Sequence, residues 1–281
     1  MPDFSSPLVR LYPPPAEETP LRGLYLAHDL RRRLAADPDR PYVYTNYVMS
    51  LDGRIAVAQP GRADMVLPKT IANERDWRLF QELAVQADVI LTSGRYLRQY
   101  AEGRGQEILQ VYNDPRFADL KEWRLARGLP PHPAFAVVSA SLEFPIPPAL
   151  VQEGRPVIVA PPEEADPARV EALRAQLGTV VIAGRRRVEG RPLVEHLFRL
   201  GYRLIYNATG PQVMHLLLAD DMLDRMYLTV VSRLVGGDPF APLVQGPLLS
   251  PAVGLRLHSL YWDSHALDGD GQLFLCYDRE R

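Results

Sequence analysis

The sequence predicts an α/β domain with a mixed, mostly parallel sheet, helices on both faces and an antiparallel C-terminal edge. From Pro41 onward, strand-like segments alternate with helix-like segments, as in sheets built from βα units. The stretches DVILT, PVIVA and TVVIA are apolar throughout, which is typical of strands covered on both faces. The last two strand-like segments have no helix between them, so we expect them to pair antiparallel.

The composition is that of an ordinary globular protein. The chain has 281 residues, is 47% hydrophobic and carries a formal net charge of -2, so no overall field favours nucleic acid or an anionic membrane. No apolar run approaches the ~18 residues of a membrane span, and the N-terminal segment lacks the apolar core of a signal peptide. We therefore expect a cytoplasmic protein with no nucleic-acid or membrane partner. The single cysteine, Cys276, excludes an intrachain disulfide.

We expect residues 1–40 to form an N-terminal extension and residues 41–281 to form the domain. The extension contains Pro13–Pro15, which fits neither a helix nor a central strand, and ends in a short helix within Leu24–Ala36. The strands expected in the domain are Tyr42–Met49, Asp88–Thr92, Phe135–Ser139, Pro156–Ala160, Thr179–Ala183, Arg203–Tyr206, Arg225–Val231, Leu255–Trp262 and Gln272–Tyr277.

Helices are expected between several of these strands. Asn73 is a good N-cap for the first helix. Its apolar positions recur at helical spacing and predict one buried face, made of Trp77, Phe80, Leu83, Ala84 and Ala87. The other helices are Asp166–Gln176, Pro192–Leu200 and Pro211–Ala219, the last two with proline at the first helical position. Residues 101–134 are rich in glycine and proline, and we expect an irregular functional loop there.

Two loops at the carboxyl ends of strands have the small residues that let a backbone approach a phosphate. ILTSGRYL leaves a strand through Ser93 and Gly94, and LIYNATGPQV leaves a strand through Thr209 and Gly210. An ordinary βα loop is the alternative for either stretch alone. Neither is a GxGxxG or a GxxxxGK[ST] motif, so a kinase or an ATPase has little support.

Arginines follow two of the expected strands. Arg95, directly after Gly94, suits an adenosine 2′-phosphate, because its planar guanidinium matches phosphate geometry. Arg185–Arg187 follow TVVIA; a solvated loop is the favoured interpretation, and a second phosphate contact is the alternative. The six histidines show no metal-binding spacing and no GxSxG elbow is present, so metal-dependent and serine hydrolysis are disfavoured.

The segment YVYTNYVMSLDGRIAV breaks its strand pattern at Ser50–Gly53. Asp-Gly between two apolar runs is typical of a tight hairpin turn, because glycine tolerates positive φ. The alternative is that the strand delivers the Asp52 carboxylate to a site.

TNYVMSLDGRIA resembles the opening strand of the reductase domain of bifunctional riboflavin-biosynthesis deaminase-reductases. Three further stretches resemble segments of that family in the same order. They are LAVQADVILTSGRYLRQYAEGRG, FAVVSASLEFP and LIYNATGPQVMHLLLADDMLDRMYLTVVSRLVGGDPF, and the ordered set covers roughly Pro41 to Phe274.

The resemblance implies a dihydrofolate-reductase-like fold and NADPH as hydride donor. It implies reduction of a ribosylaminopyrimidine 5′-phosphate to the ribitylamino form, by a stand-alone reductase without the zinc deaminase half. A homodimer is also implied, and Leu255, Leu257, Leu260, Tyr261 and Trp262 supply the apolar strand surface for it. The alternatives are an NADPH-dependent reductase of another heterocycle or a pterin, and a non-catalytic nucleotide-binding module.

The resemblance also assigns positions. Asn46 falls near the pyrimidine, and Ser50 and Asp52 fall beside nicotinamide and substrate, where we expect the catalytic groups. The cofactor-binding positions that it implies are Gly53, Ser93, Gly94, Arg95, Ser139, Ser141, Thr209, Gly210, Pro211 and Gln212. Ala208 stands where the family has a glutamate near the substrate, which leaves open whether the pyrimidine is deaminated.

Overall fold

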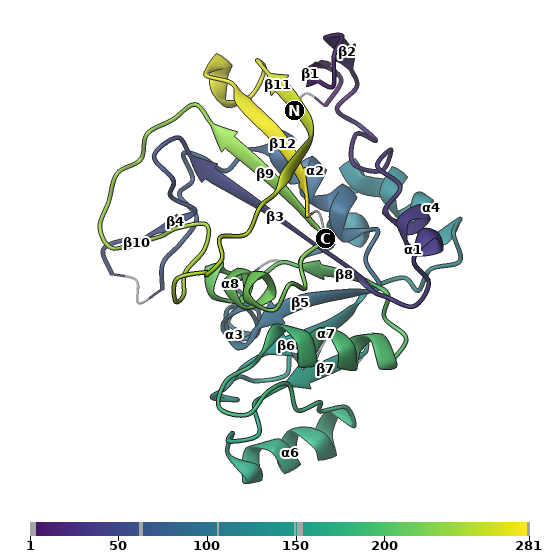
Figure 1. Ribbon diagram of the computed structural model, residues 1–281, viewed down its shortest axis with the longest axis vertical. Coiled ribbons are helices and arrows are strands. Elements are labelled where there is room, and N and C mark those ends of the chain that lie inside the picture. Colours follow the sequence, from purple (N-terminus) through teal and green to yellow (C-terminus); the bar gives the residue numbers. More distant parts are fainter. Residues whose placement is uncertain (1–3, 62–63, 106, 149, 151–153, 280–281) are drawn as a thin grey trace.

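The computed structural model describes residues 4–61, 64–105, 107–148, 150 and 154–279, and one ten-stranded sheet runs through it (Figure 1). Its parallel strands are β3 (Tyr42–Ser50), β5 (Val89–Ser93), β6 (Ala134–Val138), β7 (Val157–Ala160), β8 (Leu204–Asn207) and β9 (Arg225–Val231). Its antiparallel strands are β1 (Leu8–Tyr12), β2 (Glu17–Thr19), β11 (Arg256–Asp263) and β12 (Gln272–Asp278). The strand order β2-β1-β11-β12-β9-β3-β8-β5-β6-β7 confirms the predicted mixed, mostly parallel sheet.

Helices cover both faces of the sheet, as predicted. One face carries α1 (Leu30–Ala36), α2 (Glu74–Ala84), α3 (Gly94–Ala101), α4 (Ala118–Leu125) and α6 (Pro167–Leu177). The other face carries α7 (Gly190–Arg199) and α8 (Pro211–Ala219). A separate two-stranded ladder joins β4 (Ala56–Val57) to β10 (Phe240–Ala241). Short 3₁₀ turns occur at η1 (Gln110–Tyr112), η2 (Pro115–Phe117) and η3 (Leu267–Gly269).

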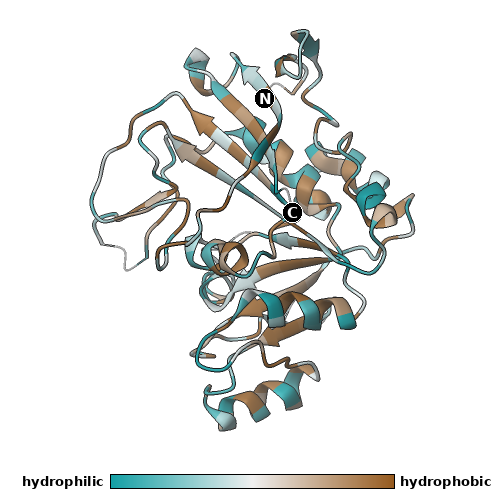
Figure 2. Ribbon diagram, in the orientation of Figure 1, coloured by the Kyte–Doolittle hydropathy of each residue, from teal (hydrophilic) through white to brown (hydrophobic). Residues whose placement is uncertain are grey.

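Figure 2 shows that β5, β7 and β9 are largely hydrophobic, whereas α6 and α7 carry both hydrophobic and hydrophilic residues, as expected for helices with one side on the sheet. Two cores result, one on each face of the sheet. Among the described residues, none of the helices has the length and apolar character needed to cross a bilayer.

Several predicted elements agree closely with the structure, and two do not. Pro211–Ala219 and Arg225–Val231 have the predicted bounds, and the Asn73 side chain caps α2 by accepting from the N–H of Asp76 at 3.0 Å. The predicted strand Thr179–Ala183 is wrong: it is reduced to one bridge, between Val180 and Val159. The predicted loop 101–134 is also wrong as an irregular segment, because it forms η1, η2 and α4 and buries apolar side chains.

The expected N-terminal extension contributes to the sheet and to the core. β1 pairs with β11, so β11 and β12 form the antiparallel side of the sheet but not its outermost edge. Leu8, Leu21 and Leu24 are buried in the core around α2. Residues 8–36 pack into the sheet and core of the domain that follows them. A domain boundary at residue 40 stays a prediction.

The N-terminal segment changes which side of α2 is buried. Glu82 accepts hydrogen bonds from the backbone N–H groups of Gly23 (2.6 Å) and Tyr25 (3.0 Å). Arg78 and Glu82 are fully buried although they lie on the polar side of the helix. Trp77 and Phe80, predicted as core residues, keep partial exposure. The helix is covered on its polar side because a segment distant in sequence packs over it.

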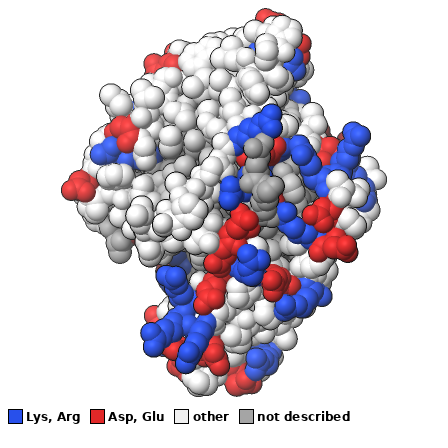
Figure 3. All heavy atoms as spheres, in the orientation of Figure 1, with Lys and Arg blue, Asp and Glu red and all other residues white. Residues whose placement is uncertain are grey.

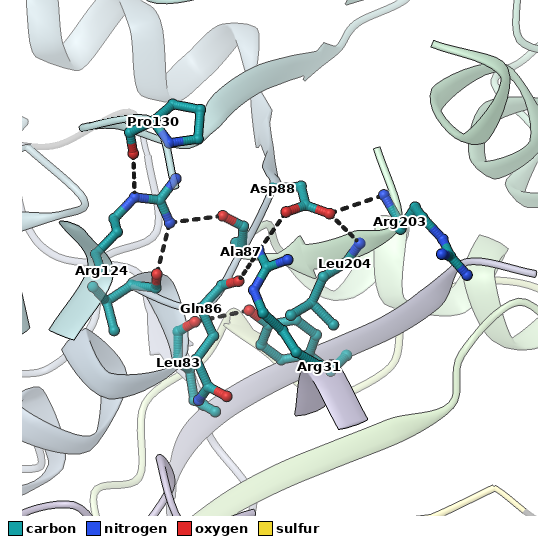
Figure 4. Close-up of polar contacts among 11 residues, drawn as sticks. Arg31, Leu83, Gln86, Ala87, Asp88, Arg124, Pro130, Arg203 and Leu204 are labelled. Carbon is teal, nitrogen blue, oxygen red and sulfur yellow. Dashed lines mark hydrogen bonds and ion pairs between the residues drawn. The ribbon is translucent and has the colours of Figure 1, made fainter. Parts of the chain in front are cut away.

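The amino ends of the parallel strands are closed by polar contacts (Figure 4). Asp88, just before β5, accepts from the N–H groups of Arg203 (3.0 Å) and Leu204 (2.9 Å) at the start of β8 and pairs with Arg31. The Arg124 guanidinium donates to three backbone carbonyls, those of Val85, Ala87 and Pro130. These groups hold together the amino ends of the strands, at the opposite side of the sheet from their carboxyl ends.

Candidate functional site

A cavity of about 880 Å³ lies at the carboxyl ends of β5, β6 and β8. These three strands are neighbours in the sheet, so the loops that follow them converge. Of the residues singled out from the sequence, those that line the cavity are Ser93, Arg95, Ser139, Thr209, Gly210, Pro211 and Gln212. Both loops that were predicted to approach a phosphate are therefore brought to one site.

Two helices begin at this cavity. The Ser93 hydroxyl caps α3 by accepting from the N–H of Tyr96 at 3.3 Å. α8 begins with Pro211, and no side chain caps it, so the N–H groups of its first turn are available to a ligand. Helix N-termini carry positive partial charge, and two of them at one cavity favour an anion.

Arg95 lies between these two helix ends. Its Nη2 is 3.7 Å from the position that a Cβ would take at Gly210, so the guanidinium crosses from α3 to the α8 loop. It is exposed and makes no hydrogen bond or ion pair with the part of the chain that the structure describes. An unpaired guanidinium at a cavity wall is suited to a phosphate.

Only one of the three consecutive arginines lines the cavity. Arg187 does so from the loop before α7, and it has no charged partner within the described ranges. Arg186 instead faces Glu164 at 3.6 Å. The interpretation of 185–187 as a solvated loop therefore holds for Arg186, whereas Arg187 lies at the cavity.

Two predicted cofactor positions have other surroundings. Gly94 is buried, and a Cβ there would lie 2.6 Å from a ring carbon of Phe144, so this glycine permits the packing of α3. Ser141 is exposed, and its hydroxyl accepts from the N–H of Glu143 at 3.4 Å. Neither residue lines the cavity.

Residues 50–54 form a three-residue turn. The N–H of Gly53 donates to the carbonyl of Ser50 at 2.9 Å, and the N–H of Ser50 donates to the carbonyl of Arg54 at 3.0 Å. Gly53 has φ +82°, the conformation that such a turn requires. The chain then leaves β3, and β4 pairs with β10 in the second ladder. The hydrogen bonds that close the turn are those of a hairpin, but the strands on its two sides, β3 and β4, belong to different sheets.

Both oxygens of the Asp52 carboxylate already have partners within the protein. It accepts from the Ser50 hydroxyl, from the N–H groups of Val235 (3.3 Å) and Gly236 (2.8 Å), and pairs with Arg54 at 2.8 Å. The hydrogen bonds from Ser50 and Gly236 lower its pKa to about 2. The carboxylate fastens the turn to residues 235–236, and neither Ser50, Asp52 nor Gly53 lines the cavity.

Asn46 lies on the sheet face that α2 covers. Its Oδ1 accepts from the hydroxyl of Tyr206, and it keeps partial exposure. Tyr206 in turn makes an edge contact with Phe80, with ring centres 5.7 Å apart. The Phe80 ring stacks on Trp77 at 4.7 Å. The structure thus links Asn46 to the partly exposed aromatic side of α2, and Asn46 does not line the cavity.

One functional candidate was missed by sequence reasoning. Asp76, in the first turn of α2, is 8% exposed, and its carboxylate accepts from the Thr229 hydroxyl at 2.6 Å. Burial raises the pKa of this carboxyl to about 6, against the opposing effect of that hydrogen bond. An acid three residues after an N-cap is ordinarily a helix-capping group, so its spacing alone gives no reason to single it out.

No metal centre is present within the described ranges, since no three His, Cys, Asp or Glu side chains there could hold an ion. The predicted absence of a metal-dependent hydrolase motif remains a prediction from sequence. The cavity is suited to an anion because two helix N-termini, Arg95 and Arg187 lie at its wall.

Comparisons with known proteins agree on one family. Residues 41–265 match the RibD C-terminal domain. A protein of Methanothermobacter thermautotrophicus named 2,5-diamino-6-ribosylamino-4(3H)-pyrimidinone 5′-phosphate reductase is 28% identical over 225 residues, which is 79% of this chain and 93% of that protein. A protein of Archaeoglobus fulgidus with the same name is 26% identical over 202 residues, 70% of this chain and 83% of the other.

Solved structures share the fold. A pyrimidine reductase-like protein from Corynebacterium diphtheriae superposes with a TM-score of 0.62 at 20% identity, covering 86% of this chain and 92% of its own. The riboflavin biosynthesis reductase of Saccharomyces cerevisiae superposes with a TM-score of 0.55 at 16% identity, covering 91% and 99%.

Proposed function

Since the chain belongs to the RibD C-terminal domain family, we propose that it is an NADPH-dependent reductase of riboflavin biosynthesis that converts a ribosylaminopyrimidine 5′-phosphate to its ribitylamino form. The names of its relatives favour the 2,5-diamino pyrimidinone as the substrate. Within the chain, the observation that carries the proposal is the unpaired Arg95 between two helix N-termini in an 880 Å³ cavity.

The residues at the cavity fit a pyridine nucleotide. Its volume is within the range of small-molecule sites. The N-terminus of α8, with Gly210 and no side-chain cap, suits a pyrophosphate. Arg95 suits the 2′-phosphate that distinguishes NADPH from NADH. When bound, the cofactor supplies a hydride to the electrophilic ribose carbon of the ring-opened substrate.

The protein residues orient these partners. Asn207 fixes the loop that follows β8, because its Oδ1 accepts from the Thr209 N–H at 3.3 Å. The Tyr47 hydroxyl donates to the Thr209 carbonyl at 3.1 Å from β3. Asn46 keeps its amide N–H groups for the pyrimidine, because its Oδ1 is taken by Tyr206. A loop held on two sides presents the cofactor to a fixed position, as alignment of reactants requires.

We assign Asp52 a positioning role within this function. Sequence reasoning placed it against the substrate, and its four contacts instead favour a carboxylate that joins the turn after β3 to residues 235–236. Ser50 serves the same purpose through its hydrogen bond to Asp52. The turn and the segment before β10 are then held as one unit beside the cavity residues Ile55 and Ala241.

The experiment that tests the function is an NADPH-oxidation assay with the diamino pyrimidinone 5′-phosphate and its deaminated uracil counterpart side by side. Turnover of either, with the ribitylamino product identified by mass, is the expected result. An enzyme that binds NADPH but reduces neither compound would contradict the proposed substrate class and leave the cofactor assignment standing.

We also propose a homodimer formed through an open face of the sheet. Apolar side chains at alternate positions share this face and are only half-buried: Met49, Val230, Leu260, Trp262, Leu273, Leu275 and Tyr277. Of the residues expected at the interface, Tyr261 points to the opposite face and is buried. This face is formed mainly by β9, β11 and β12. No described helix covers this side of the three strands in Figure 1, and Figure 3 shows few charged side chains there.

A large apolar face is typical of protein interfaces. Sedimentation velocity at micromolar concentration is expected to give a dimer, and Leu275→Glu is expected to give a folded monomer. A monomeric parent protein would reject the dimer.

A further inference from the structure

A second cavity, of about 490 Å³, lies at the amino ends of β3 and β9. Tyr42, the first residue of β3, and Asp224, directly before β9, belong to its wall. It shares no lining residue with the cavity at the carboxyl ends of β5, β6 and β8. Because β3 and β9 run parallel to those strands, the two cavities lie at opposite ends of the sheet.

Segments that are distant in sequence build the wall of this second cavity. The N-terminal segment supplies Tyr12, at the end of β1, and Arg33, in the last turn of α1. The antiparallel strands supply Arg256, at the start of β11, and Asp278, at the end of β12. Arg279 follows directly. Three arginines from three different segments thus meet at one cavity.

The two aspartates of this wall already have cations of their own. Both oxygens of Asp278 accept from the Arg225 guanidinium, at 2.6 and 2.8 Å. Asp224 pairs with Arg40 and accepts from the N–H of Val43 at 2.7 Å. Neither Arg225 nor Arg40 lines the cavity. The charge that the wall presents to a ligand is therefore set by its three arginines.

Two of the three arginines keep N–H groups for a ligand. The Nη2 of Arg33 is 3.9 Å from Asp278, at the outer limit of an ion pair, and its side chain is 45% exposed. Arg279 is held at Nε by Asp221 and at Nη1 by the Gly254 carbonyl, each at 3.1 Å. Its Nη2 makes no hydrogen bond within the described ranges. A guanidinium that is fixed on one side and open on the other is suited to a phosphate.

The rest of the wall offers a hydroxyl donor and apolar surface. The Tyr42 hydroxyl has no hydrogen-bond partner in the part of the chain that the structure describes. Burial raises the pKa of this phenol, so it stays protonated and can donate. Tyr12, which is 38% exposed, and Leu257 add surface against which a flat ring can pack. The volume of the cavity is within the range of small-molecule sites.

We propose that this cavity is a second ligand site, which takes an organic phosphate monoester of mononucleotide size. The phosphate pairs with Arg33 and Arg279, and the ring of the ligand packs against Tyr12. Since Tyr12 and Arg33 come from the N-terminal segment, the bound ligand also fastens residues 8–36 to the sheet. The proposal goes beyond the reductase function and does not depend on it.

The test measures binding while the first cavity is filled. Adenosine 5′-monophosphate (AMP), inorganic phosphate and adenosine are titrated by calorimetry into NADPH-saturated protein. AMP is expected to bind, phosphate to bind more weakly, and adenosine to give no measurable binding. Arg33→Ala is expected to weaken AMP about tenfold, and Arg33→Lys, which keeps the charge, is expected to weaken it less.

Two control variants locate the bound AMP. Arg199→Ala removes an exposed arginine that pairs with Glu195 and lines neither cavity, so AMP affinity is expected to stay unchanged. Arg95→Ala alters the first cavity alone and is also expected to keep AMP affinity.

Protection from protease gives a second readout. AMP is expected to slow thermolysin cleavage within residues 8–36 of the parent, and to have little effect on Arg33→Ala. Thermolysin cleaves beside apolar residues, so the arginine variants lose no cleavage site.

Three results would overturn the second site. They are no binding of AMP at millimolar concentration, adenosine that binds as tightly as AMP, and an AMP affinity that Arg33→Ala and Arg279→Ala leave unchanged. Because none of these measurements involves turnover of a pyrimidine, each leaves the proposed reductase function intact.

Discussion

Asp52 and Asp76 are two aspartates beside β3 whose surroundings are opposite. Asp52 is 22% exposed at its side chain, yet both of its oxygens are taken by Ser50, Arg54 and two backbone N–H groups, and its pKa falls to about 2. Asp76 is almost fully buried, yet it has a single hydroxyl partner, and its pKa rises to about 6. The exposure of a carboxylate therefore does not indicate how many hydrogen-bond and ion-pair partners it has within the protein.

The largest effect is expected from Asp52→Asn. The amide cannot accept from Ser50 and from residues 235–236 while pairing with Arg54, so the turn after β3 shifts relative to the cavity. Displacement of a positioned group costs about 100-fold in rate, and we expect a loss of that size in kcat/KM with NADPH affinity kept. Steady-state kinetics and cofactor titration measure the two quantities.

The pH profile of kcat/KM in Asp52→Asn distinguishes a positioning role of Asp52 from a role in proton transfer. Because the pKa of Asp52 is about 2, its charge does not change in the working range, and the pH profile of kcat/KM should keep its shape in Asp52→Asn. Full turnover in this variant would show that the carboxylate is dispensable. Loss of an acidic limb from the profile would show that Asp52 acts as a proton donor or acceptor and not as a positioning group.

Arg95→Ala is expected to have the next largest effect, on cofactor choice. The parent should prefer NADPH to NADH, and loss of a guanidinium–phosphate pair should weaken NADPH by about 10- to 100-fold while leaving NADH nearly unchanged. Arg186→Ala is the matched control, because Arg186 pairs with Glu164 and does not line the cavity. Equal parent affinities for the two cofactors would reject the assignment.

An effect on stability, and only above about pH 4, is expected from Asp76→Asn. A carboxyl whose pKa is raised on folding stabilises the native state below its unfolded value of about 4, and this contribution is lost as pH rises through about 6. Above that pH the ionised, buried group costs on the order of 3 kcal/mol, which the amide avoids. Thermal unfolding should show a higher Tm for the variant at pH 8 and convergence with the parent below pH 4.

Comparing parent and variant at each pH isolates Asp76 from other groups. Asp224, whose pKa burial also raises to about 6, titrates in both proteins and cancels. The titratable neighbours of Asp76 are the phenols of Tyr25 and Tyr206, which remain neutral throughout. A Tm difference independent of pH would mean that the pKa of Asp76 is the same in the native and unfolded states, and would contradict a pKa raised by burial.

Local signals predicted well which loops lie at the cavity. Small residues directly after apolar strands identified both βα loops, and proline at the first position gave the start of α8. These features depend on neighbours a few residues away. Arg187 could not be separated from its two neighbours, because nothing in a run of arginines shows which one turns toward a cavity.

The surroundings of Asp52 and Asp76 were predicted less well because their contacts are distant in sequence. The partners of Asp52 at residues 235–236 lie more than 180 positions away, and Thr229 lies 153 positions from Asp76. The apolar periodicity of α2 correctly indicated Leu83, Ala84 and Ala87 as buried, with Trp77 and Phe80 half-buried against the same core. It gave no sign that the N-terminal segment also buries the opposite, polar side. Periodicity describes one amphipathic face and cannot predict a second covering layer.

The pairing of β1 with β11 has a consequence for the order in which the protein assembles during synthesis. β1 leaves the ribosome long before its partner at Arg256–Asp263, because more than 200 residues separate the two strands. Until that strand emerges, Leu8 has no sheet to join, although the polar side of α2 already needs its cover. The sheet therefore closes only after β11 has emerged, and we expect nascent chains halted before residue 256 to remain sensitive to protease along residues 8–36.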